Sequence, residues 1–213
     1  MNLRTVVKVC GITRLEDARV ALEAGADWLG FVVKHDGPRA IDIELARAIA
    51  EAVDGAVTVA VMVAPEPEEA LALARRMRAR RVQLHRVDAT RWPVDFPLPI
   101  TIAVPVASDG SLTAPLPREL HTVMLDTAHD TLAGGTGRAF PWETARVVAA
   151  TRPVVLAGGL SEDNVADAIA TVRPFGVDAS SRLEVSPGIK DHDRVRRFVA
   201  EVRRCDEHHG TAA

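Results

Sequence analysis

The sequence predicts an α/β protein, a single TIM-type (β/α)8 barrel. Short apolar runs recur along the 213-residue chain, and most are followed by Ala-rich segments with helical periodicity, an alternation typical of a parallel sheet. The runs are continuously apolar, as expected of strands buried on both faces. Eight such units in a chain of this length favour a closed barrel over an open sheet.

Each apolar run is a predicted strand: Val6–Cys10, Trp28–Val33, Val57–Val63, Arg81–Leu84, Ile100–Val104, Thr122–Asp126, Pro153–Ala157 and Gly176–Asp178. We expect helices at Leu15–Ala24, Ile43–Val53, Glu66–Arg78, Trp142–Ala150, Glu162–Val172 and Asp191–Arg203. Gly25 suits the residue after a helix, Pro67 a first helical turn and Ser161 an N-cap. The Pro-rich stretches Trp92–Pro99 and Pro105–Arg118 are weakly helical and predict short or irregular helices. Residues 1–205 would form the barrel, and 206–213 a flexible, polar C-terminal tail.

Composition restricts the class of protein. Hydrophobic residues make up 47% and charged residues 26% of the chain, and the net charge is −3, so nucleic acid is not an expected partner. The segment Arg75–Arg81 is read as the solvated end of a helix. Two cysteines are too few for a disulfide scaffold, and the N-terminus resembles neither a signal peptide nor a membrane helix. We expect a cytoplasmic protein without a membrane partner, and a monomer.

In such a barrel the active site lies at the carboxyl ends of the strands. Cys10 ends the first predicted strand and is followed by Gly11. A cysteine there acts as base or nucleophile if its thiolate is stabilised, although a lone cysteine is more often a small buried apolar residue. Lys8 shares a strand face with Cys10, but we expect depth in the barrel to separate the two.

Asp126 ends the sixth predicted strand. A carboxylate in that place suits proton transfer, and its alternative role is to cap a loop. A glycine-rich stretch at 134–137 follows, which is a weak signal for a ligand loop.

The loops after the seventh and eighth strands are where these barrels commonly bind phosphate. Gly158 and Gly159 would expose backbone amides before a helix, and Ser180 and Ser181 would add further donors. Ordinary tight turns are the alternative. Arg39, after the second strand, offers a guanidinium suited to a carboxylate, unless it is simply a surface arginine. The histidine spacing predicts no metal site.

These residues together resemble the phosphoribosylanthranilate isomerase family over nearly the whole chain. The matching segments are Lys8–Thr13, Gly25–Asp27 leading to Gly30–Val32, Pro38-Arg39, Val82–His85, Leu125–Thr127, Gly134–Gly137 with Phe140 and Trp142, Leu156–Leu160 with Asn164-Val165, and Gly176–Ser181 with Glu184, Pro187-Gly188 and Lys190-Asp191. No single motif decides the resemblance. Their order and spacing carry it.

The resemblance implies an Amadori rearrangement of N-(5-phosphoribosyl)anthranilate in tryptophan biosynthesis, without a cofactor. Cys10 would be the base and Asp126 the acid. Arg39 would hold the anthranilate carboxylate. The phosphate of this small sugar substrate would bind at Gly158, Gly159, Ser180 and Ser181.

Four positions depart from the family pattern, which usually has Ser at 37, Gly at 86, Asp at 141 and Gly at 182. This chain has Gly37, Arg86, Pro141 and Arg182 there. If position 182 needs a positive φ, arginine is costly; alternatively its guanidinium contacts the phosphate or pairs with Glu184.

Two other readings stay open. One is the related Amadori isomerase of histidine biosynthesis, although that family typically has Asp where Cys10 stands and clearer half-barrel repetition. The other is a diverged barrel that binds a phosphorylated ligand or a partner protein without turnover, since a fold alone does not establish activity.

Overall fold

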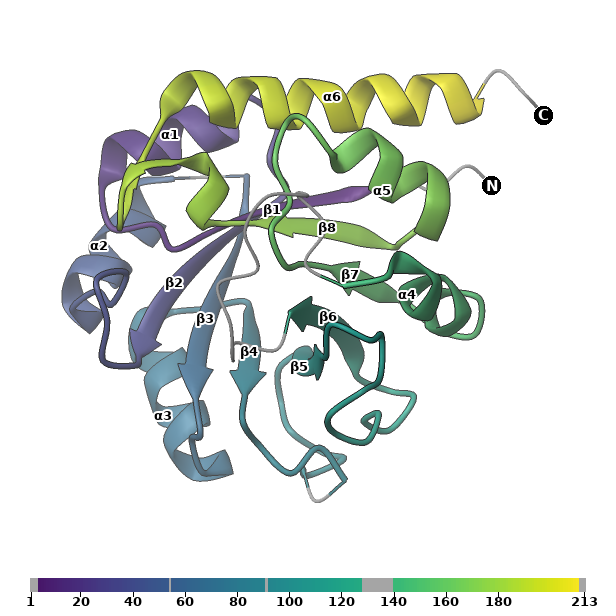
Figure 1. Cartoon of the computed structure of the whole chain (residues 1–213). Coiled ribbons are helices and arrows are strands. Elements are labelled where there is room, and N and C mark those ends of the chain that lie inside the picture. Colours follow the sequence, from purple (N-terminus) through teal and green to yellow (C-terminus); the bar gives the residue numbers. More distant parts are fainter. Residues whose placement is uncertain (1–3, 54, 91, 128–139, 211–213) are drawn as a thin grey trace.

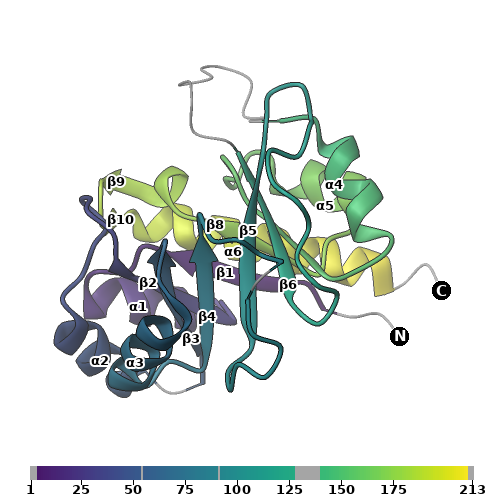
Figure 2. The same cartoon turned by 90° about the horizontal axis from the view of Figure 1, so that it is seen from below.

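The computed structural model describes residues 4–53, 55–90, 92–127 and 140–210, with the side chains of residues 209 and 210 excepted. Eight parallel strands form a closed barrel in the order β1-β2-β3-β4-β5-β6-β7-β8. Helices surround the strands (Figure 1), and the view turned by 90° shows α2 and α3 on one side of the barrel and α4 and α5 on the other (Figure 2). The predicted fold class is confirmed.

The strands lie within one or two residues of the predicted runs, because buried apolar runs are a local signal. They are β1 Val6–Cys10, β2 Trp28–Lys34, β3 Val57–Val63, β4 Arg81–His85, β5 Ile100–Val106, β6 Thr122–Thr127, β7 Val154–Leu156 and β8 Gly176–Ala179.

The helices are α1 Leu15–Glu23, α2 Ile43–Ala52, α3 Pro67–Met77, α4 Trp142–Ala149, α5 Val165–Val172 and α6 His192–Gly210. Between β4 and β5, and between β5 and β6, the described chain forms no helix, so the short or irregular helices predicted for these Pro-rich stretches are absent. After β8 the structure adds a 3-10 turn, η1 Ser181–Leu183, and a hairpin of β9 Glu184–Ser186 and β10 Ile189–Lys190, which the sequence analysis did not predict.

Successive strand residues point alternately into the barrel and toward the helices. The inward set includes Cys10, Val59 and Met124, and the outward set, including Val9 and Ala60, packs under the helices. Because both faces are buried, the strands need apolar residues throughout, which explains their continuous runs.

The predicted helix ends hold at two places. Gly25 follows α1 with φ +99°, and Pro67 is the first residue of α3. Ser161, however, is not the N-cap of α5, since Asn164 holds that position. Ser161 instead opens a preceding turn, in which its backbone amide donates to Asn164 Oδ1 at 2.9 Å and its hydroxyl accepts from the amide of Asp163.

The tail predicted to begin at residue 206 starts inside α6, which continues to Gly210. Asp206 accepts a hydrogen bond from the backbone amide of Thr5 at 3.1 Å, and Val202 and Cys205 are buried. The polar sequence of this segment gives no indication of the Asp206–Thr5 contact, because Thr5 lies at the other end of the chain.

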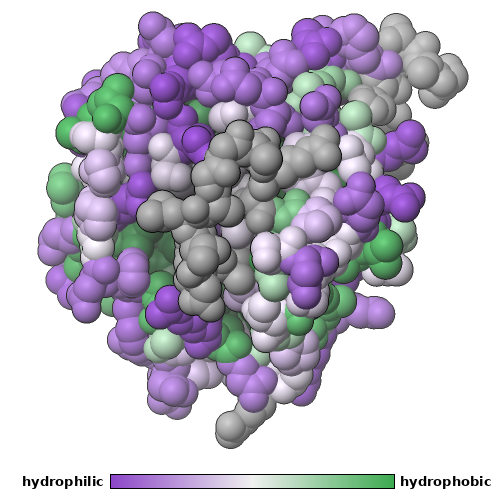
Figure 3. Space-filling model, viewed as in Figure 1, coloured by the Kyte–Doolittle hydropathy of each residue, from purple (hydrophilic) through white to green (hydrophobic). Residues whose placement is uncertain are grey.

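Hydrophilic side chains dominate the edge of the molecule over α6 (Figure 3). Among the described residues, none of the helices combines the length and apolar character needed to cross a membrane.

Pro141 stands at the N-cap of α4 and makes no side-chain capping hydrogen bond. An aspartate there would accept from a free amide of the first turn, which is worth about 1 kcal/mol. We expect Pro141→Asp to exceed Pro141→Ala by about this amount in free energy of unfolding, measured by urea denaturation. Pro141→Ala is the control, since it also removes the proline but cannot cap. Equal stabilities would contradict the prediction.

Candidate active site

Cys10 is the last residue of β1 and is 7% exposed. Gly11 follows with φ +75°, and a Cβ at that position would stand 3.0 Å from Arg39 Cδ and 3.1 Å from Ser180 Oγ. The Ser180 hydroxyl donates to the carbonyl of Cys10 at 3.1 Å. The turn at Gly11 thus brings the second and eighth loops against the end of β1.

Lys8 lies beside Cys10, contrary to the expectation that depth separates them. The point where a Cβ on Gly30 would stand is 2.8 Å from Cys10 Sγ and 3.0 Å from Lys8 Nζ. Gly30 is the register partner of Cys10 on β2. The lysine stem spans the rise of about 7 Å between alternate strand residues, and the missing side chain at Gly30 leaves room for both groups.

Burial raises the pKa of the Cys10 thiol, because the charged thiolate loses its hydration. The neighbouring Lys8 ammonium acts in the opposite direction and lowers that pKa. Burial wins, so the free protein holds Cys10 as a thiol near neutral pH.

Asp126 lies near the carboxyl end of β6, and its Oδ1 accepts from the backbone amide of Thr127 at 2.8 Å. Gly158, in the loop after β7, packs against this corner: a Cβ there would stand 2.8 Å from the Thr127 nitrogen and 3.3 Å from Asp126 Oδ1. The glycine-rich stretch at 134–137 lies outside the described residues.

The four predicted phosphate-binding residues follow two neighbouring strands. Gly158 and Gly159 have φ of +86° and +75°, a conformation that favours glycine, and Ser180 and Ser181 follow β8. Because β7 and β8 are paired, the two loops open at the same edge of the barrel mouth.

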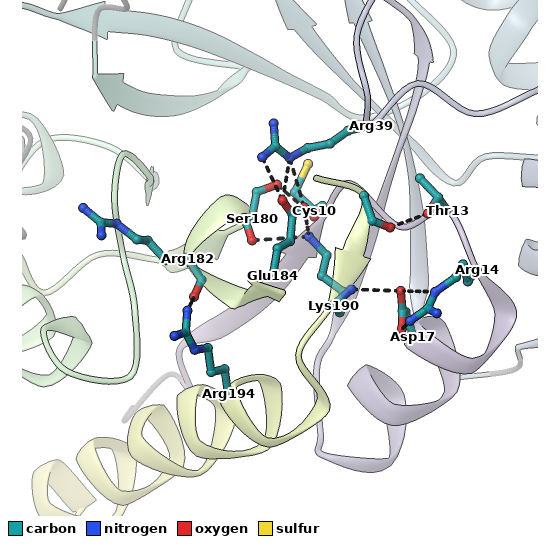
Figure 4. A network of polar contacts seen from close by, with 11 residues as sticks. Cys10, Thr13, Arg14, Asp17, Arg39, Ser180, Arg182, Glu184, Lys190 and Arg194 are labelled. Atoms are coloured by element: carbon teal, nitrogen blue, oxygen red, sulfur yellow. Dashed lines mark hydrogen bonds and ion pairs between the residues drawn. The ribbon is translucent and has the colours of Figure 1, made fainter. Parts of the chain in front are cut away.

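Arg39 is held by Glu184, a residue to which the sequence analysis gave no such role. Its Nε and Nη2 donate to the Glu184 carboxylate at 2.7–3.0 Å, and Lys190 Nζ donates to Glu184 Oε1 at 2.8 Å (Figure 4). The Glu184 side chain is 3% exposed. Burial alone would raise its pKa, but the hydrogen bonds from Arg39 and Lys190 outweigh that effect and lower the pKa.

A contact with α1 fixes the position of Lys190. Its backbone amide donates to Asp17 Oδ2 at 3.1 Å, and the buried Asp17 also accepts from Arg14 and His192. Thr13 donates to the carbonyl of Gly188. The β9–β10 hairpin is thereby fixed over the end of β1, which carries Lys190 and Glu184 to Arg39 (Figure 4). The acid–lysine pair flanking Pro187-Gly188 was the sequence signal for this arrangement.

Comparison with known proteins agrees with this geometry. The sequence profile of N-(5′-phosphoribosyl)anthranilate (PRA) isomerase matches residues 7–201. The chain belongs to this family. It is an isomerase of tryptophan biosynthesis, and the predicted family, enzyme class and pathway are confirmed.

Individual PRA isomerases resemble the chain over nearly its full length. The relative from Halorhodospira halophila is 38% identical over 209 residues, covering 96% of this chain and all of the relative. That from Geobacter sp. (strain M21) is 41% identical, with 94% and 98% covered. The structure from Thermotoga maritima is 34% identical, covers 94% of this chain and 99% of that chain, and gives a TM-score of 0.80. Another, solved with reduced 1-(o-carboxyphenylamino)-1-deoxyribulose 5-phosphate, gives 0.77 at 33% identity, with the same coverage.

Besides Pro141, two departures from the PRA isomerase pattern have structural outcomes. Arg86 has φ +55°, a left-handed conformation that strains a residue with a Cβ by about 1 kcal/mol. The glycine that is usual at this position avoids that strain. Arg182 lies in η1 and is not among the residues with positive φ. Glu184 pairs with Arg39 and Lys190 rather than with Arg182, whose side chain points away from the cluster (Figure 4).

We expect Glu184→Gln to lower the free energy of unfolding by about 3 kcal/mol at pH 7, because two cations lose their buried counter-charge. The measurement is urea denaturation at several pH values. The folded pKa of Glu184 is lowered, so its contribution is complete above the unfolded carboxyl pKa of about 4.3 and is lost as the pH falls through the folded value. The difference between wild type and variant should therefore shrink below about pH 4.

The matched control is Glu201→Gln, which removes the partly exposed partner of the exposed Arg204. We expect it to cost less than about 1 kcal/mol at any pH. Equal losses of unfolding free energy in the two variants would show that the buried Glu184 cluster stabilises the fold no more than the Glu201–Arg204 pair does.

Proposed function

We propose that this isomerase converts N-(5′-phosphoribosyl)anthranilate to 1-(2-carboxyphenylamino)-1-deoxyribulose 5-phosphate, with Cys10 as the base and Asp126 as the acid. The observation that carries the assignment is the placement of the two groups. Cys10 ends β1, and Asp126 lies near the end of β6, three strands away around the barrel through β7 and β8. A substrate across the mouth would therefore meet an acid and a base on different sides.

The reaction needs two separate proton transfers. Asp126 gives a proton to the ring oxygen of the ribose, the bond from that oxygen to C1 breaks, and an iminium forms between C1 and the amine nitrogen. The Cys10 thiolate then takes the proton from C2, and the electron pair of that bond neutralises the iminium, giving an enolamine. Protonation at C1 and loss of the proton from the C2 hydroxyl give the ketone. No electrons leave the substrate, so the chemistry requires no cofactor.

The binding roles follow the charges of the substrate. Arg39 would hold the anthranilate carboxylate with the Nη1 edge of its guanidinium, since Glu184 occupies Nε and Nη2. Gly158, Gly159, Ser180 and Ser181 would hold the phosphate. The compound bound in the related solved structure is named as a carboxyphenylamino sugar 5-phosphate, which supports a site with two anion subsites.

We further propose that the protein acts as a monomer in the cytoplasm, with this small phosphorylated substrate and without a nucleic-acid or membrane partner. The net charge of −3 supports the absence of a nucleic-acid partner.

We expect Cys10→Ser and Asp126→Asn each to lower kcat by a hundredfold or more, the loss typical of a missing acid or base. The assay is the decay of anthranilate fluorescence on freshly prepared phosphoribosylanthranilate. Because the base must be a thiolate and burial raises the pKa of the Cys10 thiol, kcat/KM of the wild type should rise with pH beyond neutrality.

Cys205→Ala is the control, because Cys205 lies in α6, away from the barrel mouth. It should keep the wild-type rate. A wild type that binds a phosphorylated product analogue but shows no turnover would favour the non-catalytic barrel. Activity retained in Cys10→Ser would remove Cys10 from the mechanism.

A further inference from the structure

Lys8 is a charged residue in an unusual place. Its side chain is 1% exposed in the interior of the barrel, where an ammonium is costly unless it is paired. Its counter-ion is Asp178 on β8, with Nζ and Oδ1 2.6 Å apart. The two residues face each other in the β1–β8 register, so barrel closure itself forms the pair. The proposed reaction assigns no task to this buried ion pair.

The pair lies directly below the thiol. Lys8 Nζ and Cys10 Sγ share the space left by the missing side chain of Gly30, each within 3.0 Å of the same point. The Lys8 ammonium thus has the Asp178 carboxylate and the Cys10 thiol as neighbours. Three residues from β1 and β8 bring carboxylate, ammonium and sulphur together.

We infer that Lys8 is a positioning residue that stabilises the Cys10 thiolate, and that Asp178 keeps the Lys8 ammonium protonated and directed at the sulphur. The inference rests on the proposed role of Cys10 as the base. It adds a defined counter-ion, present before substrate binds, for the negative charge that the base must carry.

The charges around the thiol support this assignment. Lys8 from β1 and Lys190 from β10 both favour the thiolate, and Asp178 from β8 opposes it. The effect of Lys8 exceeds that of either other group. Lys190 is also bound to Glu184, which in turn holds Arg39, so its charge is shared within that cluster.

Lys8 is a cation near neutral pH. Burial lowers its pKa, but attraction to Asp178 and Cys10 outweighs burial and leaves the pKa above its ordinary value. A group that is already a cation while its neighbour is a neutral thiol suits electrostatic stabilisation of the thiolate better than proton transfer.

The test is the ionisation of Cys10 in Lys8→Met, made in a Cys205→Ala background so that Cys10 is the only thiol. The rate of alkylation by iodoacetamide between pH 6 and 10 reports the thiolate fraction without requiring isomerase activity. We expect the thiol pKa to rise by one unit or more and alkylation at pH 8 to slow by about tenfold or more. In kcat/KM, the limb that rises with pH should move by the same amount, with KM changed less than kcat.

Two further variants separate this role from a structural one. Lys8→Met leaves the Asp178 carboxylate unpaired, so the double variant Lys8→Met/Asp178→Asn restores neutrality if the single variant does not fold. Its thiol pKa should lie between those of wild type and Lys8→Met, because Asp178 opposes the thiolate. Arg81→Met removes another half-buried cation, one that lies 4.3 Å over the Trp28 ring, and should leave the thiol pKa unchanged.

An unchanged thiol pKa in a folded Lys8 variant would overturn the inference, even if activity falls. Failure of the proposed function gives a different pair of results. Cys10→Ser would then turn over at the wild-type rate, whereas Lys8→Met would still shift the pH profile of Cys10 alkylation.

Discussion

Pairing between β1 and β8 closes the barrel, and the site depends on that closure. Val6 lies opposite Gly176 in this register, where a Cβ would stand 2.9 Å from the Val6 carbonyl oxygen. Glycine permits this close approach. Two residues further along each strand, Lys8 and Asp178 meet as a buried ion pair, and the next inward residue of β1 is Cys10. One strand pairing thus determines both the shape of the barrel and the electrostatic surroundings of the thiol.

The site is built so that charges lie beside opposite charges. Asp178 faces Lys8 below the thiol, and Glu184 lies between Arg39 and Lys190 at the mouth. Burial of these ions is tolerated because each has a hydrogen-bonded partner. Cys10 is different, since burial favours its neutral form. The proposed base therefore acquires its charge in an environment that already holds the matching cation.

Most of the secondary structure could be predicted because its signals are local. Apolar runs located all eight strands of the barrel, and helical periodicity located the six α-helices of the described residues, with Gly25 and Pro67 marking helix ends. Two errors arose where distant contacts decide. The end of α6 is held by Asp206 bonding to Thr5, and the β9–β10 hairpin is anchored on Asp17 of α1. Neither contact leaves a periodic pattern in the sequence.

The sequence by itself determined the order of the eight barrel strands and of the six helices around them. It also determined which polar residues, Cys10, Asp126 and Arg39 among them, stand at or just after strand ends. Only the tertiary structure decided which groups surround them. Lys8 meets Asp178 across 170 residues of chain, and Arg39 meets Glu184 across 145. Such contacts depend on strand register, on the reach of a lysine stem and on the space beside a glycine. Those quantities exist only once the barrel has closed.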